Sequence, residues 1–175
     1  QPLASTEGAR LPFWSPDGRS IGFSTETQLK RVSLDEGSVQ TITAAAIFAG
    51  GGASWNRDDT ILYSASPGAP IWRVPVTGGE PVAATRFEAE QRGHFSPHFL
   101  PDQRHFLFFV TGPPDTRGVH VGQLGDTSSR RLVDADGSAD TGGKGGSGVG
   151  GSGSGGVAGA GSGGAGGVAG AGIGG

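Results

Sequence analysis

The sequence predicts an all-β fold, a partial β-propeller of about three four-stranded blades followed by a glycine-rich low-complexity tail. The first observation is a recurring turn, in which an aromatic residue is followed closely by an aspartate. Asp17, Asp58 and Asp102 mark these turns at spacings of 41 and 44 residues. A period of roughly 40–45 residues is typical of four-stranded propeller blades. The second observation is composition, because 21 of the 36 glycines lie in the last 39 residues.

The division of the chain follows from these two observations. Residues 1–8 form an N-terminal segment, and residues 9–140 hold the three repeats. The repeats extend over about residues 9–45, 46–87 and 88–136. The tail, residues 141–175, consists mostly of glycine, alanine and serine, which bury too little surface to offset the backbone entropy of folding. The tail is interpreted as a flexible low-complexity segment or as an out-of-frame translation of what should have been further blades, and an assembly segment is the alternative.

Each repeat is expected to contain strands joined by turns. The first repeat begins with a short apolar entry, and residues 20–24 then alternate apolar with small side chains, as a half-buried strand does. Further β segments are expected over residues 29–34 and 39–43 in the first repeat, 61–63, 71–74 and 81–83 in the second, and 105–110, 119–121 and 131–133 in the third. No segment carries a sustained helical period, which supports an all-β chain.

The turn has a physical explanation in its central residues, Pro16, Asp17 and Gly18. Proline presets φ at the first corner, aspartate bonds to the backbone ahead of it, and glycine accepts a positive φ. Pro101 and Asp102 repeat the pattern in the third repeat. We therefore expect the three repeat aspartates to close their turns by hydrogen bonds rather than to act as catalytic carboxylates.

An aromatic residue precedes each turn: Trp14, Trp55 and Phe99. A blade buries its faces only when another blade covers them, so most of the stability of such a repeat comes from stacking. The sequence therefore predicts that all three aromatic side chains pack between neighbouring blades.

Several runs of residues resemble a known family. Residues 14–19, followed by residues 21–23, resemble the WD40-like propeller repeat of bacterial periplasmic TolB-type proteins. Residues 29–32, 71–75 with 78–82, and 99–102 with 104–107 are similar to successive blades of the extracytoplasmic propeller of bacterial serine/threonine receptor kinases. The resemblance covers about residues 9–135. It implies a binding or sensing propeller outside the cytoplasm, without catalysis of its own.

Composition excludes several classes of function. A net charge of −3 and a pI of about 5.7 do not suggest a nucleic-acid-binding surface. The chain has no cysteine, which excludes disulfides and thiolate metal sites. No apolar run reaches the roughly 20 residues needed to cross a bilayer, so no membrane span is expected. No cofactor is expected either, because the Gly-x-Gly-x-x-Gly matches in the tail follow no strand and arise from its glycine content.

All four histidines, His94, His98, His105 and His120, lie in the third repeat. His94 and His98 are four residues apart and share one face of a strand, so they could converge on a metal ion. Exposed or hydrogen-bonded histidines are the preferred interpretation, and no metal site is predicted.

Three residues form a possible interaction surface, because they lie on strands that approach the propeller axis or a neighbouring blade: Arg31, Trp72 and Arg73. The expected function is a non-catalytic scaffold that binds a protein or ligand outside the cytoplasm. The alternative is a secreted structural protein that assembles through open blade faces and its tail. A protein partner or self-association is expected in either case.

Overall fold

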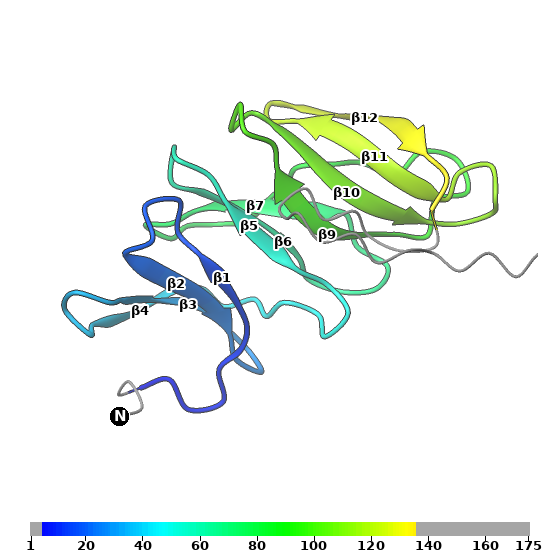
Figure 1. Ribbon diagram of the computed structural model, residues 1–175. Coiled ribbons are helices and arrows are strands. Elements are labelled where there is room, and N and C mark those ends of the chain that lie inside the picture. Colours follow the sequence, from blue (N-terminus) through cyan, green and yellow to red (C-terminus); the bar gives the residue numbers. More distant parts are fainter. Residues whose placement is uncertain (1–4, 136–175) are drawn as a thin grey trace, which may run out of the picture. The chain divides into compact units, whose positions relative to one another are not determined.

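The computed structural model describes residues 5–135, which form an all-β structure (Figure 1). Twelve strands in this range make three antiparallel sheets of four strands each, and the range contains no helix. None of the described residues therefore forms a helix that is long and apolar enough to cross a membrane. The expectations for the glycine-rich tail lie outside the described residues.

Each sheet is one predicted repeat, with its strands hydrogen-bonded in chain order. Blade 1 contains β1 (Arg10–Trp14), β2 (Ser20–Ser24), β3 (Leu29–Ser33) and β4 (Val39–Thr43). Blade 2 contains β5 (Ala53–Trp55), β6 (Thr60–Ser64), β7 (Ile71–Pro75) and β8 (Val82–Ala83). Blade 3 contains β9 (Gly93–Phe99), β10 (His105–Thr111), β11 (Gly118–Gln123) and β12 (Asp126–Val133). The apolar entry of each repeat is thus its first strand.

The blades stack in chain order, and their first strands lie beside one another. Strand β1 lies beside β5, and β5 lies beside β9 (Figure 1). The first strands are therefore the inner strands, and β4, β8 and β12 are the outer edges of their sheets. We term the side of a blade that packs on the blade before it the preceding face, and the opposite side the following face.

Two apolar cores lie between the blades. Between blades 1 and 2, Leu29 and Ile42 meet residues of the preceding face of blade 2, including Trp55, Ile61, Tyr63 and Val74. Between blades 2 and 3, Leu62 and Ile71 meet residues of the preceding face of blade 3, including Phe99, Phe106, Phe108 and Val110. Successive side chains of a strand point to opposite faces, so β6 directs Ile61 and Tyr63 to one core and Leu62 to the other.

Gly22 makes room for an aromatic contact between blades 1 and 2. The ring of Phe13 lies over Gly22, and a Cβ atom at Gly22 would stand only 2.2 Å from the Phe13 Cζ. The same ring meets the Trp55 indole edge-on, with 6.5 Å between the ring centroids. The small residue in β2 is thus required by the packing of β1 against blade 2.

His94 is buried between blades 2 and 3 in a closed hydrogen-bond network. Its Nδ1 lies 2.7 Å from the Thr85 hydroxyl, and its Nε2 lies 2.9 Å from Gln91 Oε1. Because the amide oxygen can only accept, Nε2 carries the proton and Nδ1 accepts the Thr85 hydroxyl. Burial, with a contribution from the positive form of His120, lowers the pKa of His94 to about 3. His94 is therefore neutral at physiological pH.

Candidate functional site

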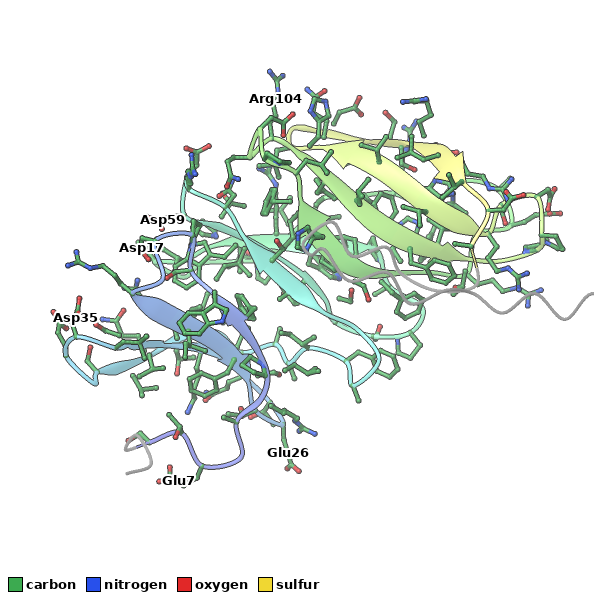
Figure 2. The ribbon with its side chains drawn as sticks, in the orientation of Figure 1. Glu7, Asp17, Glu26, Asp35, Asp59 and Arg104 are labelled. Carbon is green, nitrogen blue, oxygen red and sulfur yellow. The ribbon has the colours of Figure 1, made fainter. Side chains whose placement is uncertain are left out.

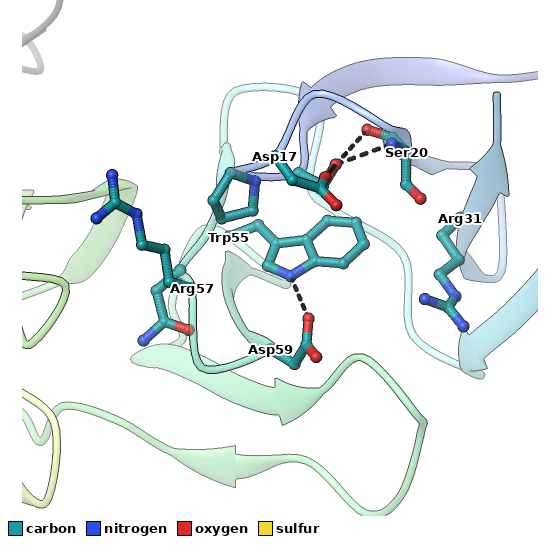
Figure 3. Close-up of a pocket in the computed structure, with 9 residues that line it drawn as sticks. Asp17, Ser20, Arg31, Trp55, Arg57 and Asp59 are labelled. Carbon is teal, nitrogen blue, oxygen red and sulfur yellow. Dashed lines mark hydrogen bonds between the residues drawn. The ribbon is translucent and has the colours of Figure 1, made fainter. Parts of the chain in front are cut away.

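A pocket of about 490 Å³ lies between blades 1 and 2, where the β1–β2 and β5–β6 turns approach each other (Figure 3). We term it the turn pocket. Its lining residues are Ser15, Pro16, Asp17 and Ser20 from the first turn, Arg31 from β3, and Trp55, Asn56, Arg57 and Asp59 from the second turn. It therefore contains two of the residues singled out in the turn motif of blade 1, Pro16 and Asp17.

The turn of blade 1 is closed by Asp17 and Ser15 together. Asp17 Oδ1 accepts the Arg19 N–H at 3.0 Å and the Ser15 hydroxyl at 2.6 Å. The Ser15 oxygen accepts the Ser20 N–H at 2.8 Å. The two bonds that Asp17 accepts, from Ser15 first and from Arg19 second, hold the pKa of its exposed carboxyl below the ordinary value. Asp17 thus closes the turn, as predicted, and carries a negative charge at neutral pH.

In blade 2 the turn is closed by a different residue. Asn56 Oδ1 accepts the N–H groups of Asp58 at 3.1 Å and Thr60 at 2.9 Å. Asn56 occupies the repeat position of Ser15, and its longer side chain reaches both amides from the start of the turn. The prediction that the Asp58 carboxylate closes this turn is therefore wrong.

In blade 3 the aspartate again closes the turn. Asp102 Oδ1 accepts the N–H groups of Arg104 at 3.1 Å and His105 at 2.9 Å. Asp102 Oδ2 also lies 2.5 Å from His105 Nδ1. The bond from the His105 side chain is the largest of the causes that lower the pKa of Asp102 to about 2. The prediction for Asp102 is confirmed by these bonds.

The fourth turn position has a positive φ in all three blades, at 71° for Gly18, 55° for Asp59 and 62° for Gln103. Glycine is favoured there, and a residue with a side chain is strained by about 1 kcal/mol or more. The two side chains make compensating contacts. Asp59 Oδ1 accepts the Trp55 indole N–H at 3.3 Å, and Gln103 Oε1 accepts the backbone N–H of Arg57 at 3.0 Å.

Gln103 connects the turns of blades 2 and 3. In addition to its side-chain bond, its backbone carbonyl oxygen accepts a hydrogen bond from the side-chain Nδ2 of Asn56 at 2.9 Å. The sequence analysis did not identify Asn56, Asp59 or Gln103. The sequence did carry one signal, because the second and third repeats lack the glycine of the Pro-Asp-Gly pattern. A polar residue at a position that favours glycine indicates a contact that compensates for backbone strain.

The turn pocket offers charges of both signs that are not paired with each other. Arg31 donates from Nε and Nη2 to Gln40 Oε1, at 3.0 and 2.7 Å. The Arg57 guanidinium makes no ion pair or hydrogen bond with another described residue. Figure 3 shows the Asp59 carboxylate directed at the Trp55 indole nitrogen, with the guanidinium groups of Arg31 and Arg57 on opposite sides of the indole. These groups are available to a ligand.

A second hollow, of about 470 Å³, adjoins the turn pocket along the inner strands. We term it the inner groove. Its residues from blades 1 to 3 are Phe13, Trp14, Ala53, Ser54, His98, Phe99 and Gln103, together with Ser15, Pro16, Trp55 and Arg57, which it shares with the turn pocket. The two hollows thus adjoin each other, and Figure 2 shows Asp17 and Asp59 close together at this end of blades 1 and 2.

The three turn aromatics differ in environment. Trp55 and Phe99 are each only 7% exposed and pack into the cores between blades, as predicted. Trp14 is 62% exposed, so the prediction that it packs between blades is wrong for this residue. The reason is its position on the preceding face of blade 1, since no blade comes before blade 1 in residues 5–135.

The three residues of the possible interaction surface do not lie together. Arg31 lines the turn pocket, whereas Trp72 packs against the core between blades 1 and 2. Arg73 lines a separate hollow beside Glu80 and Val82 on the outer part of blade 2. All three lie on third strands, away from the inner strands, so the expected single surface is not formed.

The two histidines considered as metal ligands, His94 and His98, lie in different environments. His94 uses both ring nitrogens in the buried network, whereas His98 lines the inner groove. The kink in β9 at Ser96, which has a φ of 51°, breaks the simple alternation that would place them on one face. Within residues 5–135, no group of three or more potential ligands is arranged to hold a metal ion.

Comparison with protein families and with curated protein sequences gives no match. Solved structures do match. The chain is similar to TolB from Acinetobacter baumannii, with 16% identity, a TM-score of 0.61, and coverage of 75% of this chain and 34% of that one. It is similar to a putative TolB from Agrobacterium tumefaciens, with 21% identity, a TM-score of 0.60, and coverage of 78% and 53%.

Similar structures extend beyond TolB. A chain in the crystal structure of a nidogen/laminin complex matches with 15% identity, a TM-score of 0.58, and coverage of 73% of this chain and 49% of that one. Oligogalacturonate lyases and a prolyl endopeptidase also match. The chain spans about a third and about half the lengths of the two TolB chains. Residues 10–133 therefore have the fold of a partial β-propeller of the TolB-like type.

Proposed function

We propose that this chain is a non-catalytic propeller scaffold that binds a polypeptide segment of a partner protein outside the cytoplasm. The contact surface is the turn pocket together with the inner groove. The observation that carries the proposal is that the two hollows adjoin through shared lining residues, which places charges of both signs, not paired with each other, near an exposed tryptophan. The resemblance to TolB-type proteins supports a location outside the cytoplasm.

The chemistry of this surface suits an extended peptide with charged side chains. Arg57 offers a bidentate site for a carboxylate, and the Asp17 and Asp59 carboxylates offer acceptors for a lysine or arginine. Trp14 adds a large exposed indole, a residue type enriched at binding hot spots. The two hollows are open and partly polar, whereas small-molecule sites enclose most of the ligand in apolar surroundings.

The state of the titratable groups supports binding rather than catalysis. The lowered pKa of Asp17 keeps it ionised, so it is a poor general acid at neutral pH. The described histidines with lowered pKa values, His94 and His120, belong to blade 3 and do not line the turn pocket. The match to a chain from a nidogen/laminin complex adds support for a protein partner.

The experiment is an NMR titration of the ¹⁵N-labelled full chain with a blocked peptide, acetyl-Asp-Ala-Ala-Lys-amide. We expect shifts of the Trp55 indole N–H and of the Ser15, Arg57 and Asp59 amides. Arg57→Ala and Asp59→Asn should each weaken binding about tenfold, the range for a desolvated charge contact. Arg130→Ala and Asp58→Asn are matched controls, because both residues are exposed and lie outside the two hollows. Absence of shifts at these groups would contradict the proposal.

A further inference from the structure

The turns of neighbouring blades are joined in one case and separated in the other. Between blades 2 and 3, the Gln103 side chain accepts the backbone N–H of Arg57, and the Gln103 carbonyl oxygen accepts from the Asn56 side chain. Between residues 15–20 and residues 55–60, by contrast, no hydrogen bond joins the turns of blades 1 and 2, and the turn pocket lies there. Both walls of this pocket belong to described blades.

The turn of blade 1 lacks the two donors that Gln103 uses in blade 2. Its second position is Pro16, which has no N–H to donate. Its first position is Ser15, whose hydroxyl is donated to Asp17 Oδ1 at 2.6 Å within the same turn. Asp59, which occupies the repeat position of Gln103, therefore has no partner across the junction, and the pocket stays open.

Asp59 is held in a strained conformation that its own turn does not require. Its φ is 55°, and the turn is closed by Asn56. Its hydrogen bond to the Trp55 indole N–H is 3.3 Å long, whereas the common distance for such bonds is about 2.9–3.0 Å. Strained residues of this kind are concentrated at functional sites. The exposed Asp59 carboxylate lines the turn pocket, so the strain places a negative charge there.

We propose that Asp59 is the specificity-determining residue of the turn pocket, and that it selects a lysine or arginine side chain of the bound peptide. The inference rests on the peptide binding proposed above. The other carboxylate of the pocket, Asp17, already accepts two hydrogen bonds that close its turn. Figure 3 shows Asp59 beneath the Trp55 indole, with Arg57 to one side, so a peptide acid at Arg57 and a base at Asp59 are both accommodated.

Isothermal titration calorimetry of the full chain with two peptides tests this assignment. They are acetyl-Asp-Ala-Ala-Lys-amide and acetyl-Asp-Ala-Ala-Gln-amide, which lacks only the positive charge. The wild-type chain should bind the lysine peptide about tenfold more tightly, and Asp59→Asn should bind both peptides equally. Asp58→Asn is the matched control and should keep the wild-type preference, because Asp58 is exposed on the same turn and lines neither hollow.

Urea unfolding tests whether the strain at Asp59 serves binding rather than stability. Asp59→Gly removes the strain together with one long hydrogen bond, so its unfolding midpoint should equal or exceed that of the wild-type chain. Gln103→Gly removes similar strain but also the bond to the blade 2 turn, so its midpoint should fall.

Two kinds of result would overturn the assignment of Asp59. One is a lysine preference that persists in Asp59→Asn or is lost equally in Asp58→Asn. The other is a lower urea midpoint for Asp59→Gly than for the wild-type chain, since Asp59 would then stabilise the turn. Equal binding of both peptides by the wild-type chain would leave the proposed function standing and remove only this assignment. Binding of neither peptide would contradict the proposed function, and the assignment would fall with it.

Discussion

At the scale of single residues, packing and hydrogen bonding assign roles that the repeat pattern does not distinguish. Gly18, Asp59 and Gln103 share one positive-φ position, yet only the two with side chains make contacts there. Asn56 and Asp58 are two residues apart, and the buried amide rather than the exposed carboxylate closes the turn. Residue identity therefore decides function at equivalent positions.

Gly22→Ala tests the close approach of Phe13. Because the new methyl group would overlap the Phe13 ring, we expect a loss of about 1–3 kcal/mol in the free energy of unfolding, measured by urea denaturation. When the Phe13 ring is removed by Phe13→Val, Gly22→Ala should cost less free energy of unfolding than it does in the wild-type chain. If Gly22→Ala were as stable as the wild-type chain, the packing of β1 on β2 would differ from that described.

His94 makes stability dependent on pH. Its pKa is about 3 in the folded state and near 6.5 in an unfolded chain, so the unfolded state binds the extra proton. The resulting stability is present above pH 6.5 and is lost progressively as the pH falls toward 3, by on the order of 4 kcal/mol.

The measurement is urea unfolding of the wild-type chain and of His94→Gln between about pH 7 and pH 4. The variant should show a shallower pH dependence. Some dependence remains, because burial also lowers the pKa of His120. His98→Gln is the control, since His98 lines the inner groove and takes no part in the His94 network. Parallel pH profiles for the wild-type chain and His94→Gln would contradict the buried network.

At the scale of elements, the strands could be predicted because alternation and turn residues are local signals. The segments expected over residues 20–24 and 39–43 coincide with β2 and β4, and residues 71–74 lie within β7. The full lengths of β9 and β12 were not predicted, because Ser96 and Pro97 interrupt the middle of β9 and β12 begins with a run of polar and charged residues, which a strand pattern does not favour. Contacts between turns of different blades have no local signal at all.

Asn56 is the element-scale test, because it joins two turns. Asn56→Ala removes two acceptor bonds within the β5–β6 turn and the donor bond to the Gln103 carbonyl of the next blade. We expect a loss of about 2–3 kcal/mol in the free energy of unfolding, since these groups are left unpaired at a fully buried position. Asp58→Ala should change stability by less than about 0.5 kcal/mol. Equal effects of the two substitutions on stability would contradict the claim that Asn56, rather than Asp58, closes this turn.

At the scale of the molecule, three blades and two cores account for the fold. The 41- and 44-residue spacings predicted the blades, and the matches to TolB structures confirm the propeller architecture. The candidate site was only partly predictable. Pro16, Asp17, Trp55 and Arg31 were singled out, but their meeting in one pocket depends on how neighbouring blades stack. The exposure of Trp14 likewise depends on which blades are neighbours, and its local sequence matches that of a buried equivalent.

The central claim is that the turn pocket binds a peptide through its unpaired charges. The most direct test is a charge reversal in the pocket, with peptide affinity measured by isothermal titration calorimetry. Arg57→Glu should lose affinity for acetyl-Asp-Ala-Ala-Lys-amide by about tenfold or more, because a carboxylate would then face a carboxylate. The same variant should gain affinity for acetyl-Lys-Ala-Ala-Lys-amide, which we expect the wild-type chain to bind weakly. Arg130→Glu should behave as the wild-type chain with both peptides. Unchanged affinities for Arg57→Glu, or the same changes in Arg130→Glu, would contradict the account.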